Sequence, residues 1–147
     1  MRGVHATMLL HRNGAGYNNG RHRVLQMQVH RLDHVQLAMP PGREDEARAF
    51  YQDVLGIPEV AKPTHLANRG GCWFERGPLK VHLGLEDDFV PARKAHPAFI
   101  VDGLRELATN LQRAGYHVSR DQPLEGYERL YVDDPFGNRI ELMEPKR

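Results

Sequence analysis

The sequence predicts an α+β domain whose two halves repeat one pattern, a strand followed by a helix and then two or three further strands. Three observations support this fold class. Only two segments carry apolar residues at helical spacing, and short strand-like runs flank each of them. The order of elements in residues 32–85 then returns in residues 96–144. The repeat is one of pattern and not of close sequence identity.

The elements of the first half are assigned from apolar spacing and turn residues. A Pro-Pro-Gly sequence closes the first strand, and the acidic residues after it suit the positive end of a helix dipole. Gly56 provides the stop of that helix, and an Arg-Gly-Pro turn separates the last two strands. The elements expected are a strand at 32–39, a helix from 44 to Gly56, and strands at 71–75 and 79–85.

The second half begins with another strand and ends with a hairpin. Asp102 is the expected N-cap of a helix, and Gly115 ends the apolar stripe of that helix. The Asp-Pro-Phe-Gly sequence at 134–137 suits a tight turn between the last two strands. The elements expected are a strand at 96–101, a helix at 104–114, and strands at 116–119, 126–133 and 138–144.

The composition is that of an ordinary globular chain. Its 147 residues are 40% hydrophobic and 27% charged, which favours one domain with a real core. No apolar run approaches the ~20 residues of a membrane helix. The single cysteine, Cys72, excludes an intrachain disulfide and a cysteine-rich zinc site. A single cysteine fits a reducing compartment, and we expect a cytoplasmic protein without a membrane partner.

The charge is distributed unevenly along the chain. Residues 1–31 contain five arginines and no acidic residue, so the rest of the chain is mildly acidic. A nucleic-acid partner is not expected, because phosphate contacts need a basic face on the folded part. We interpret residues 1–26 as a flexible N-terminal extension and residues 27–147 as the domain.

Three histidines and a glutamate occupy equivalent positions in the two halves. His34 and His96 lie in the first expected strand of each half, whereas His82 and Glu141 lie in the last. A pseudo-two-fold axis would make these residues two equivalent pairs that converge on one point. Imidazole and carboxylate donors suit a borderline divalent cation. The plainer interpretation is that each is an ordinary strand residue, hydrogen-bonded inside or turned to water.

Four segments together resemble the vicinal oxygen chelate superfamily, which includes glyoxalase I, methylmalonyl-CoA epimerase, extradiol dioxygenases, fosfomycin-resistance transferases and bleomycin-resistance proteins. The resemblance covers about residues 30–145. The segments are LDHVQL at 32–37, AFYQDVLG at 49–56, AHPAF at 95–99 and DPFGNRIEL at 134–142.

The resemblance implies a fold and a metal site. The fold is two βαβββ modules that form a curled, mixed eight-stranded sheet around a divalent metal. The ligand positions of the superfamily fall on His34, His96 and Glu141, and His82 takes a fourth metal-facing position. Fe2+ or Mn2+ is favoured, and Zn2+, Ni2+ and Co2+ also suit such ligands. The resemblance further implies a homodimer that acts on a small-molecule substrate.

The resemblance leaves the reaction open. His82 departs from the Glu or Gln of glyoxalase I and the epimerase, whereas extradiol dioxygenases use a nearby acid–base His and a Tyr that matches Tyr131. Lyase or isomerase chemistry and ring cleavage therefore both stay open, with His82 and Tyr131 as the catalytic candidates. Arg129, Gln36 and Trp73 are the candidate substrate-binding residues. The alternative is a non-catalytic small-molecule binding protein of the bleomycin-resistance type.

Overall fold

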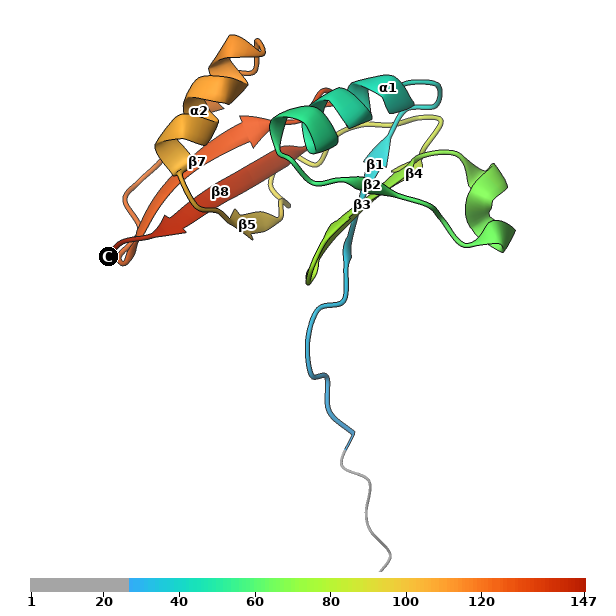
Figure 1. Cartoon of the computed structure of the whole chain (residues 1–147), viewed down its shortest axis with the longest axis horizontal. Coiled ribbons are helices and arrows are strands. Elements are labelled where there is room, and N and C mark those ends of the chain that lie inside the picture. The colour runs from blue at the N-terminus through green and yellow to red at the C-terminus, as the bar shows by residue number, and fades with distance from the viewer. Residues whose placement is uncertain (1–26) are drawn as a thin grey trace, which may run out of the picture. The chain divides into compact units, whose positions relative to one another are not determined.

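A computed structural model describes residues 27–147 of the chain, and Arg31–Arg147 form one compact unit (Figure 1). The extension predicted at residues 1–26 lies outside the described residues. Within the described part, no helix has both the length and the apolar character needed to cross a membrane.

The first module follows the predicted strand–helix–strand order. Its edge strand is followed by one α-helical turn that continues as a π-helical segment, and a 3-10 helix precedes the last two strands. The elements are β1 (Val35–Met39), α1 (Glu44–Ala47), η1 (Arg48–Val54), β2 (Glu59–Val60), η2 (Thr64–Arg69), β3 (Cys72–Arg76) and β4 (Leu79–Leu85).

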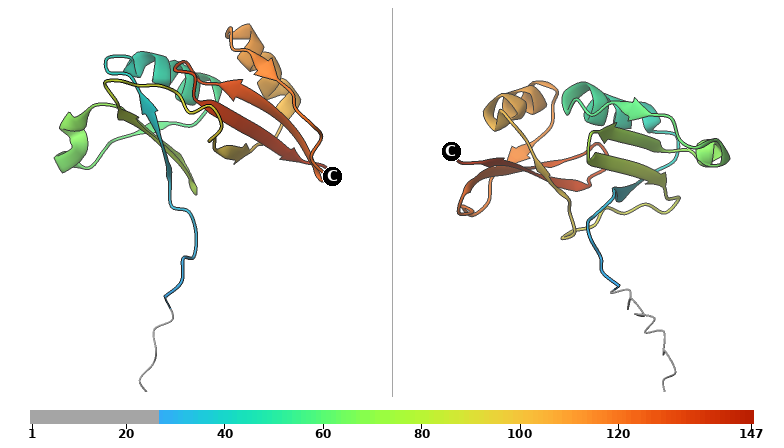
Figure 2. Two further views of the ribbon diagram at one scale, coloured as in Figure 1. Left: turned by 180° about the vertical axis from the view of Figure 1, so that it is seen from behind. Right: turned by 60° about the horizontal axis from the view of Figure 1, so that its bottom comes forward.

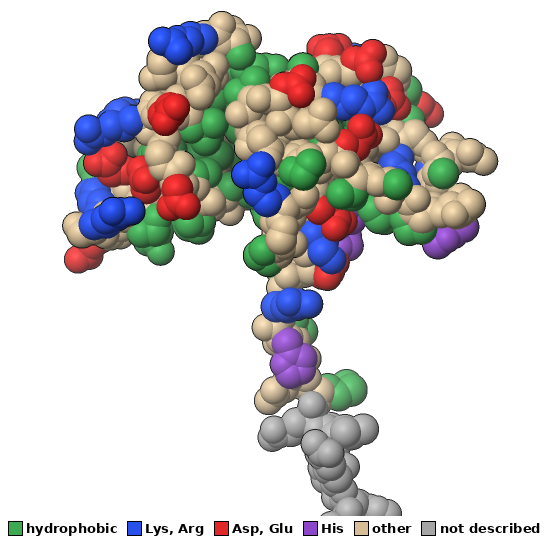
Figure 3. Space-filling view, viewed as in Figure 1, with side chains coloured by type: hydrophobic (Ala, Val, Ile, Leu, Met, Phe, Trp, Pro, Cys, Tyr) green, Lys and Arg blue, Asp and Glu red, His purple; other side chains and the backbone are tan. Residues whose placement is uncertain are grey.

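The second module repeats this order with a longer α-helix. Its elements are β5 (Ala98–Ile100), α2 (Leu104–Arg113), β6 (Val118–Ser119), β7 (Tyr127–Asp133) and β8 (Arg139–Pro145). Acidic and basic side chains are interspersed over the face shown in Figure 3, as the nearly balanced charge of the chain implies.

Each module forms its own four-stranded mixed sheet, and the two sheets have the same topology. The orders are β1-β4-β3-β2 and β5-β8-β7-β6. The first strand of each module pairs in parallel with the last, and the other pairs are antiparallel. The duplication is therefore confirmed. The eight strands stay in two open sheets, in which β1 and β5 are edge strands.

The helical segment α1–η1 of the first module and α2 of the second lie on one side of the sheets (Figures 1 and 2). Strand residues alternate between the two faces, so Val81 and Leu83 of β4 pack under the helices whereas His82 and Gly84 face the other way. A single apolar cluster contains side chains from both modules. Its largest fully buried members are Tyr51, Phe50, Phe74, Met39, Leu83, Leu111, Ile140 and Leu142.

The turn between β7 and β8 joins the two modules through buried hydrogen bonds. The Tyr51 hydroxyl donates to Asp134 Oδ2 over 2.8 Å, and Asn138 Nδ2 donates to the carbonyl of Ala38 over 2.8 Å. Asp134 Oδ1 accepts two backbone N–H groups within its own turn. Burial raises the pKa of Asp134 above its ordinary value, and the hydrogen bonds from Asn138 and Tyr51 oppose that rise.

The structure differs from the prediction at several element ends. β1 and β5 begin after His34 and His96, so neither histidine is a strand residue. Gly103, and not Asp102, is the N-cap of α2, and the carboxylate of Glu144 accepts the N–H groups of Gly103 and Leu104 there. Neither β2 nor η2 was predicted from the sequence.

Candidate metal and substrate site

The first donor pair lies on the uncovered face of the first sheet. His34 immediately precedes β1, and His82 belongs to the neighbouring strand β4. Their rings stack with centroids 4.6 Å apart. Trp73, opposite His82 in the β3–β4 ladder, covers the other side of His82 at 3.9 Å with nearly parallel rings. Trp73, His82 and His34 thus form a three-ring stack.

Carboxylates orient both imidazoles of this first pair. Asp33 Oδ1 lies 3.1 Å from His34 Nδ1, and Lys80 holds the other oxygen of Asp33 at 3.1 Å. Glu75 Oε1 lies 3.3 Å from His82 Nε2. Such partners fix the ring orientation of histidine ligands. Burial lowers the pKa of His82 despite Glu75, which favours the neutral imidazole that can donate a lone pair.

The second donor pair lies in the second module. His96 Nε2 is 3.3 Å from Glu141 Oε2, and only 7% of Glu141 is exposed. His96 Nδ1 donates to the carbonyl of Lys94 over 2.8 Å, so Nε2 of the neutral ring carries a lone pair. His96 Nε2 and the Glu141 carboxylate thus lie close enough to direct donor atoms toward one cation.

Arg129 and Tyr131 hold the other side of the Glu141 carboxylate. Arg129 Nη1 donates to Glu141 Oε1 and to the Tyr131 hydroxyl, each over 2.8 Å, and Nη2 donates to the carbonyl of Gln122. Tyr131 is the direct cross-strand neighbour of Glu141, and its ring meets that of His96 edge to face. The guanidinium predicted to bind substrate is therefore engaged with Glu141.

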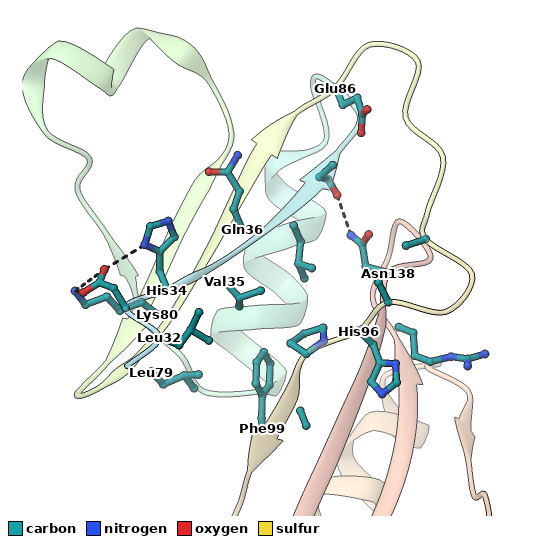
Figure 4. Close-up of a pocket in the computed structure, with 18 of the residues that line it drawn as sticks. Leu32, His34, Val35, Gln36, Leu79, Lys80, Glu86, His96, Phe99 and Asn138 are labelled. Carbon is teal, nitrogen blue, oxygen red and sulfur yellow. Dashed lines mark hydrogen bonds and ion pairs between the residues drawn. The ribbon is translucent and has the colours of Figure 1, made fainter. Parts of the chain in front are cut away.

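The two donor pairs do not come together within one chain. No group of three or more metal-binding side chains occurs among residues 27–147. His34 and His96 both line a cavity of about 630 Å³ between β1 and β5. Figure 4 shows their rings on separate walls of this cavity, directed away from each other. The four donors therefore do not converge on one point within residues 27–147 of a single chain.

The other two predicted substrate-binding residues share the face of the first pair. Gln36 points from β1 to the same side as His34 (Figure 4) and lies opposite His82 in the β1–β4 ladder. Gln36 and Trp73 also line a second cavity of about 280 Å³. Sequence reasoning missed Glu75, although it alternates with Trp73 onto the same face. It also missed Asp33, whose only signal was its position beside His34.

Residues 31–142 match the model of the Glyoxalase/Bleomycin resistance protein/Dioxygenase superfamily, and the chain belongs to this superfamily. A protein of Bacillus anthracis assigned to the glyoxalase family is 47% identical in sequence. Its structure aligns with a TM-score of 0.78 over 83% of this chain and 100% of that one.

More distant structures share the fold. A glyoxalase/dioxygenase from Nostoc punctiforme is 19% identical, with a TM-score of 0.67 over 80% of this chain and 92% of that one. The fosfomycin resistance protein FosX from Listeria monocytogenes is 18% identical, with a TM-score of 0.63 over 82% of this chain and 94% of that one.

A short match joins the chain to a curated protein of another kind. The deoxyribodipyrimidine photo-lyase of Methanothermobacter thermautotrophicus is 44% identical over 48 residues. That match covers 31% of this chain and only 11% of the photo-lyase, so it carries no conclusion about activity.

Proposed function

We propose that the protein is a metal-dependent enzyme that binds two neighbouring oxygens of a small-molecule substrate. The observation that carries this proposal is the presence of two oriented donor pairs, His34 with His82 and His96 with Glu141, at equivalent places in the two modules. Three imidazoles and one carboxylate suit a divalent ion, with Fe2+ or Mn2+ favoured over Zn2+, Ni2+ and Co2+. When bound, the metal would supply Lewis-acid stabilisation of negative charge on the substrate oxygens.

The donor set fits such an ion chemically. His34 and His96 each have Nδ1 next to an acceptor, which leaves Nε2 for a metal. His96 Nε2 and Glu141 Oε2 lie 3.3 Å apart, so both atoms can bind one cation. His82 is the fourth donor or, in its place, the base that accepts a proton from substrate.

We propose further that two copies of the chain complete the site. Each chain holds the donors as separate pairs, so a two-fold dimer can bring the first pair of one copy to the second pair of the other. The edge strands β1 and β5 are unpaired on one side within the described chain. Large apolar side chains are exposed near them: Leu32 by 79%, Val90 by 77% and Ile100 by 63%.

The remaining residues of the site have roles that follow from their contacts. Tyr131, beside Glu141 and His96, offers a hydroxyl to the reacting part of a substrate. Gln36 and Trp73 line the approach to the first donor pair. The reaction class, lyase or isomerase against extradiol ring cleavage, depends on whether His82 binds the metal or moves a proton. We place the protein in the cytoplasm, because its lone cysteine suits a reducing compartment.

The test is complementation between two defective chains. One chain carries His34→Ala and His82→Ala, and the other carries His96→Ala and Glu141→Ala. Each purified alone should bind no metal in the site. Mixed dimers made by joint refolding should each regain one intact site, or about one metal per four chains for random pairing. Failure to regain metal would refute the shared site.

Metal content of the wild type separates the main proposal from the alternative. We expect about one Fe2+ or Mn2+ per chain after anaerobic purification, and its loss in Glu141→Ala. A folded wild type that takes up no metal would instead support a small-molecule binding protein. Oxygen uptake with catechols, against turnover of hemithioacetals without oxygen uptake, then decides between the two reaction classes.

A further inference from the structure

The cavity of about 280 Å³ lies beside the first donor pair, at one end of the uncovered face of the first sheet. Trp73 is part of its wall and stacks on His82 at 3.9 Å. Gln36, which lies opposite His82 in the strand ladder, is part of its floor. His82 does not itself line the cavity, so a molecule bound there would contact Trp73 and Gln36, the two neighbours of His82 on the adjacent strands.

The lining of this cavity is positively charged. Lys62 and Arg69 both line it, and no carboxylate does among the described residues. The Lys62 ammonium donates to the carbonyl of Gly70. Arg69 forms no ion pair within residues 27–147, so its guanidinium keeps all its donors for a ligand. A guanidinium offers a paired donor geometry that matches a carboxylate.

The cavity also has apolar walls, which suit an apolar or planar body. Leu66 and Trp73 supply apolar walls. The Gln36 amide lies over Gly84, where a larger residue would not fit, because a Cβ at Gly84 would lie 2.7 Å from Gln36 Nε2. The volume of about 280 Å³ leaves room for a small organic molecule.

We propose that this cavity binds the carboxylate end of a small organic substrate whose body is planar or apolar. Arg69 and Lys62 hold the carboxylate, Trp73 and Leu66 contact the body, and the neighbouring oxygens of the substrate extend toward His82 and His34. This inference rests on the proposed function for its place in a reaction. The binding itself needs only residues of the first module.

The test compares benzoate with benzamide, which has the same shape without the charge. Both are titrated into the metal-free, full-length protein and followed by NMR. Benzoate should bind saturably and at least about tenfold more tightly than benzamide, because a charge-assisted pair is lost in the amide. Arg69→Gln should weaken benzoate by about tenfold and leave benzamide unchanged.

Arg76→Gln is the matched control, because Arg76 lies at the far end of β3 and does not line the cavity. It should bind benzoate as the wild type does. The proposal would be overturned if benzoate did not bind saturably or if benzoate and benzamide bound with equal affinity. It would also be overturned if Arg69→Gln and Arg76→Gln weakened benzoate binding equally. The titrations contain no metal, so a negative result would count against the carboxylate site alone. The proposed metal-dependent function is tested separately, by the metal content of the protein.

Discussion

The buried bond from the Tyr51 hydroxyl to Asp134 should contribute measurably to stability. Tyr51→Phe removes only the hydroxyl, whose oxygen lies 2.8 Å from Asp134 Oδ2 with both residues buried. A hydrogen bond to a charged group contributes about 1.5–3 kcal/mol. For a domain of this size, that loss corresponds to a melting temperature lower by about 6–12 °C. Urea unfolding at pH 7, followed by circular dichroism, measures the loss in free energy of unfolding.

The pH dependence gives this prediction a second arm. Burial raises the folded-state pKa of Asp134 above the ordinary aspartate value of 3.8, and the hydrogen bond from the Tyr51 hydroxyl opposes that rise. The protonated Asp134 carboxyl therefore stabilises the folded state below about pH 3.8. This contribution is lost as the pH rises through the folded-state pKa. Tyr51→Phe raises that pKa further, so its loss of stability should be largest at pH 7 and smaller at pH 3.5.

The control is Tyr116→Phe. Tyr116 packs edge to face on Phe50, and its hydroxyl forms no side-chain hydrogen bond within residues 27–147. The Tyr116→Phe variant should lose much less than 1.5 kcal/mol of its free energy of unfolding. Equal losses in the two variants at pH 7 would refute the role given to the Tyr51–Asp134 bond.

Three further outcomes are expected. Burial raises the pKa of Cys72 to about 12, so the native thiol should not react with Ellman's reagent at pH 8 but should react fully in guanidinium; fast native labelling would contradict this. Glu144→Gln should lower the free energy of unfolding in urea by about 1 kcal/mol, because it weakens the cap of α2. The nearby control Lys146→Gln should change it very little, because the Lys146 side chain forms no ion pair within residues 27–147. Arg129→Met should lower the free energy of unfolding by removing the ion pair with Glu141, and adding Glu141→Gln should restore part of the loss; additive losses would exclude the pairing.

The modular fold was predictable because its signals are local. Two apolar stripes at helical spacing and the turn residues between strands gave both helices and most strand positions. β2 is only two residues long, too short to show a period, and η2 follows no apolar pattern. β5 starts after Pro97, which has no N–H to donate to the ladder. The predicted strand from residue 96 was therefore two residues too long at its start.

The donor residues were predictable in kind but not in arrangement. Period two places His82 and Glu141 opposite the apolar residues of their strands, and the structure has both on that face. Where two modules meet depends on contacts between distant segments, such as Asn138 with Ala38, which strand periodicity does not encode. The link from Arg129 to Glu141 was missed because it crosses between strands.

The stack of Trp73 on His82 gives the protein a built-in optical reporter. Trp73 is the single tryptophan of the chain, so all its indole emission originates at this one place. Indole emission responds to the charge and polarity of the groups in contact with the ring. Occupancy of the neighbouring imidazoles or of the small cavity can therefore be followed by intrinsic fluorescence, without a label and on the unmodified chain.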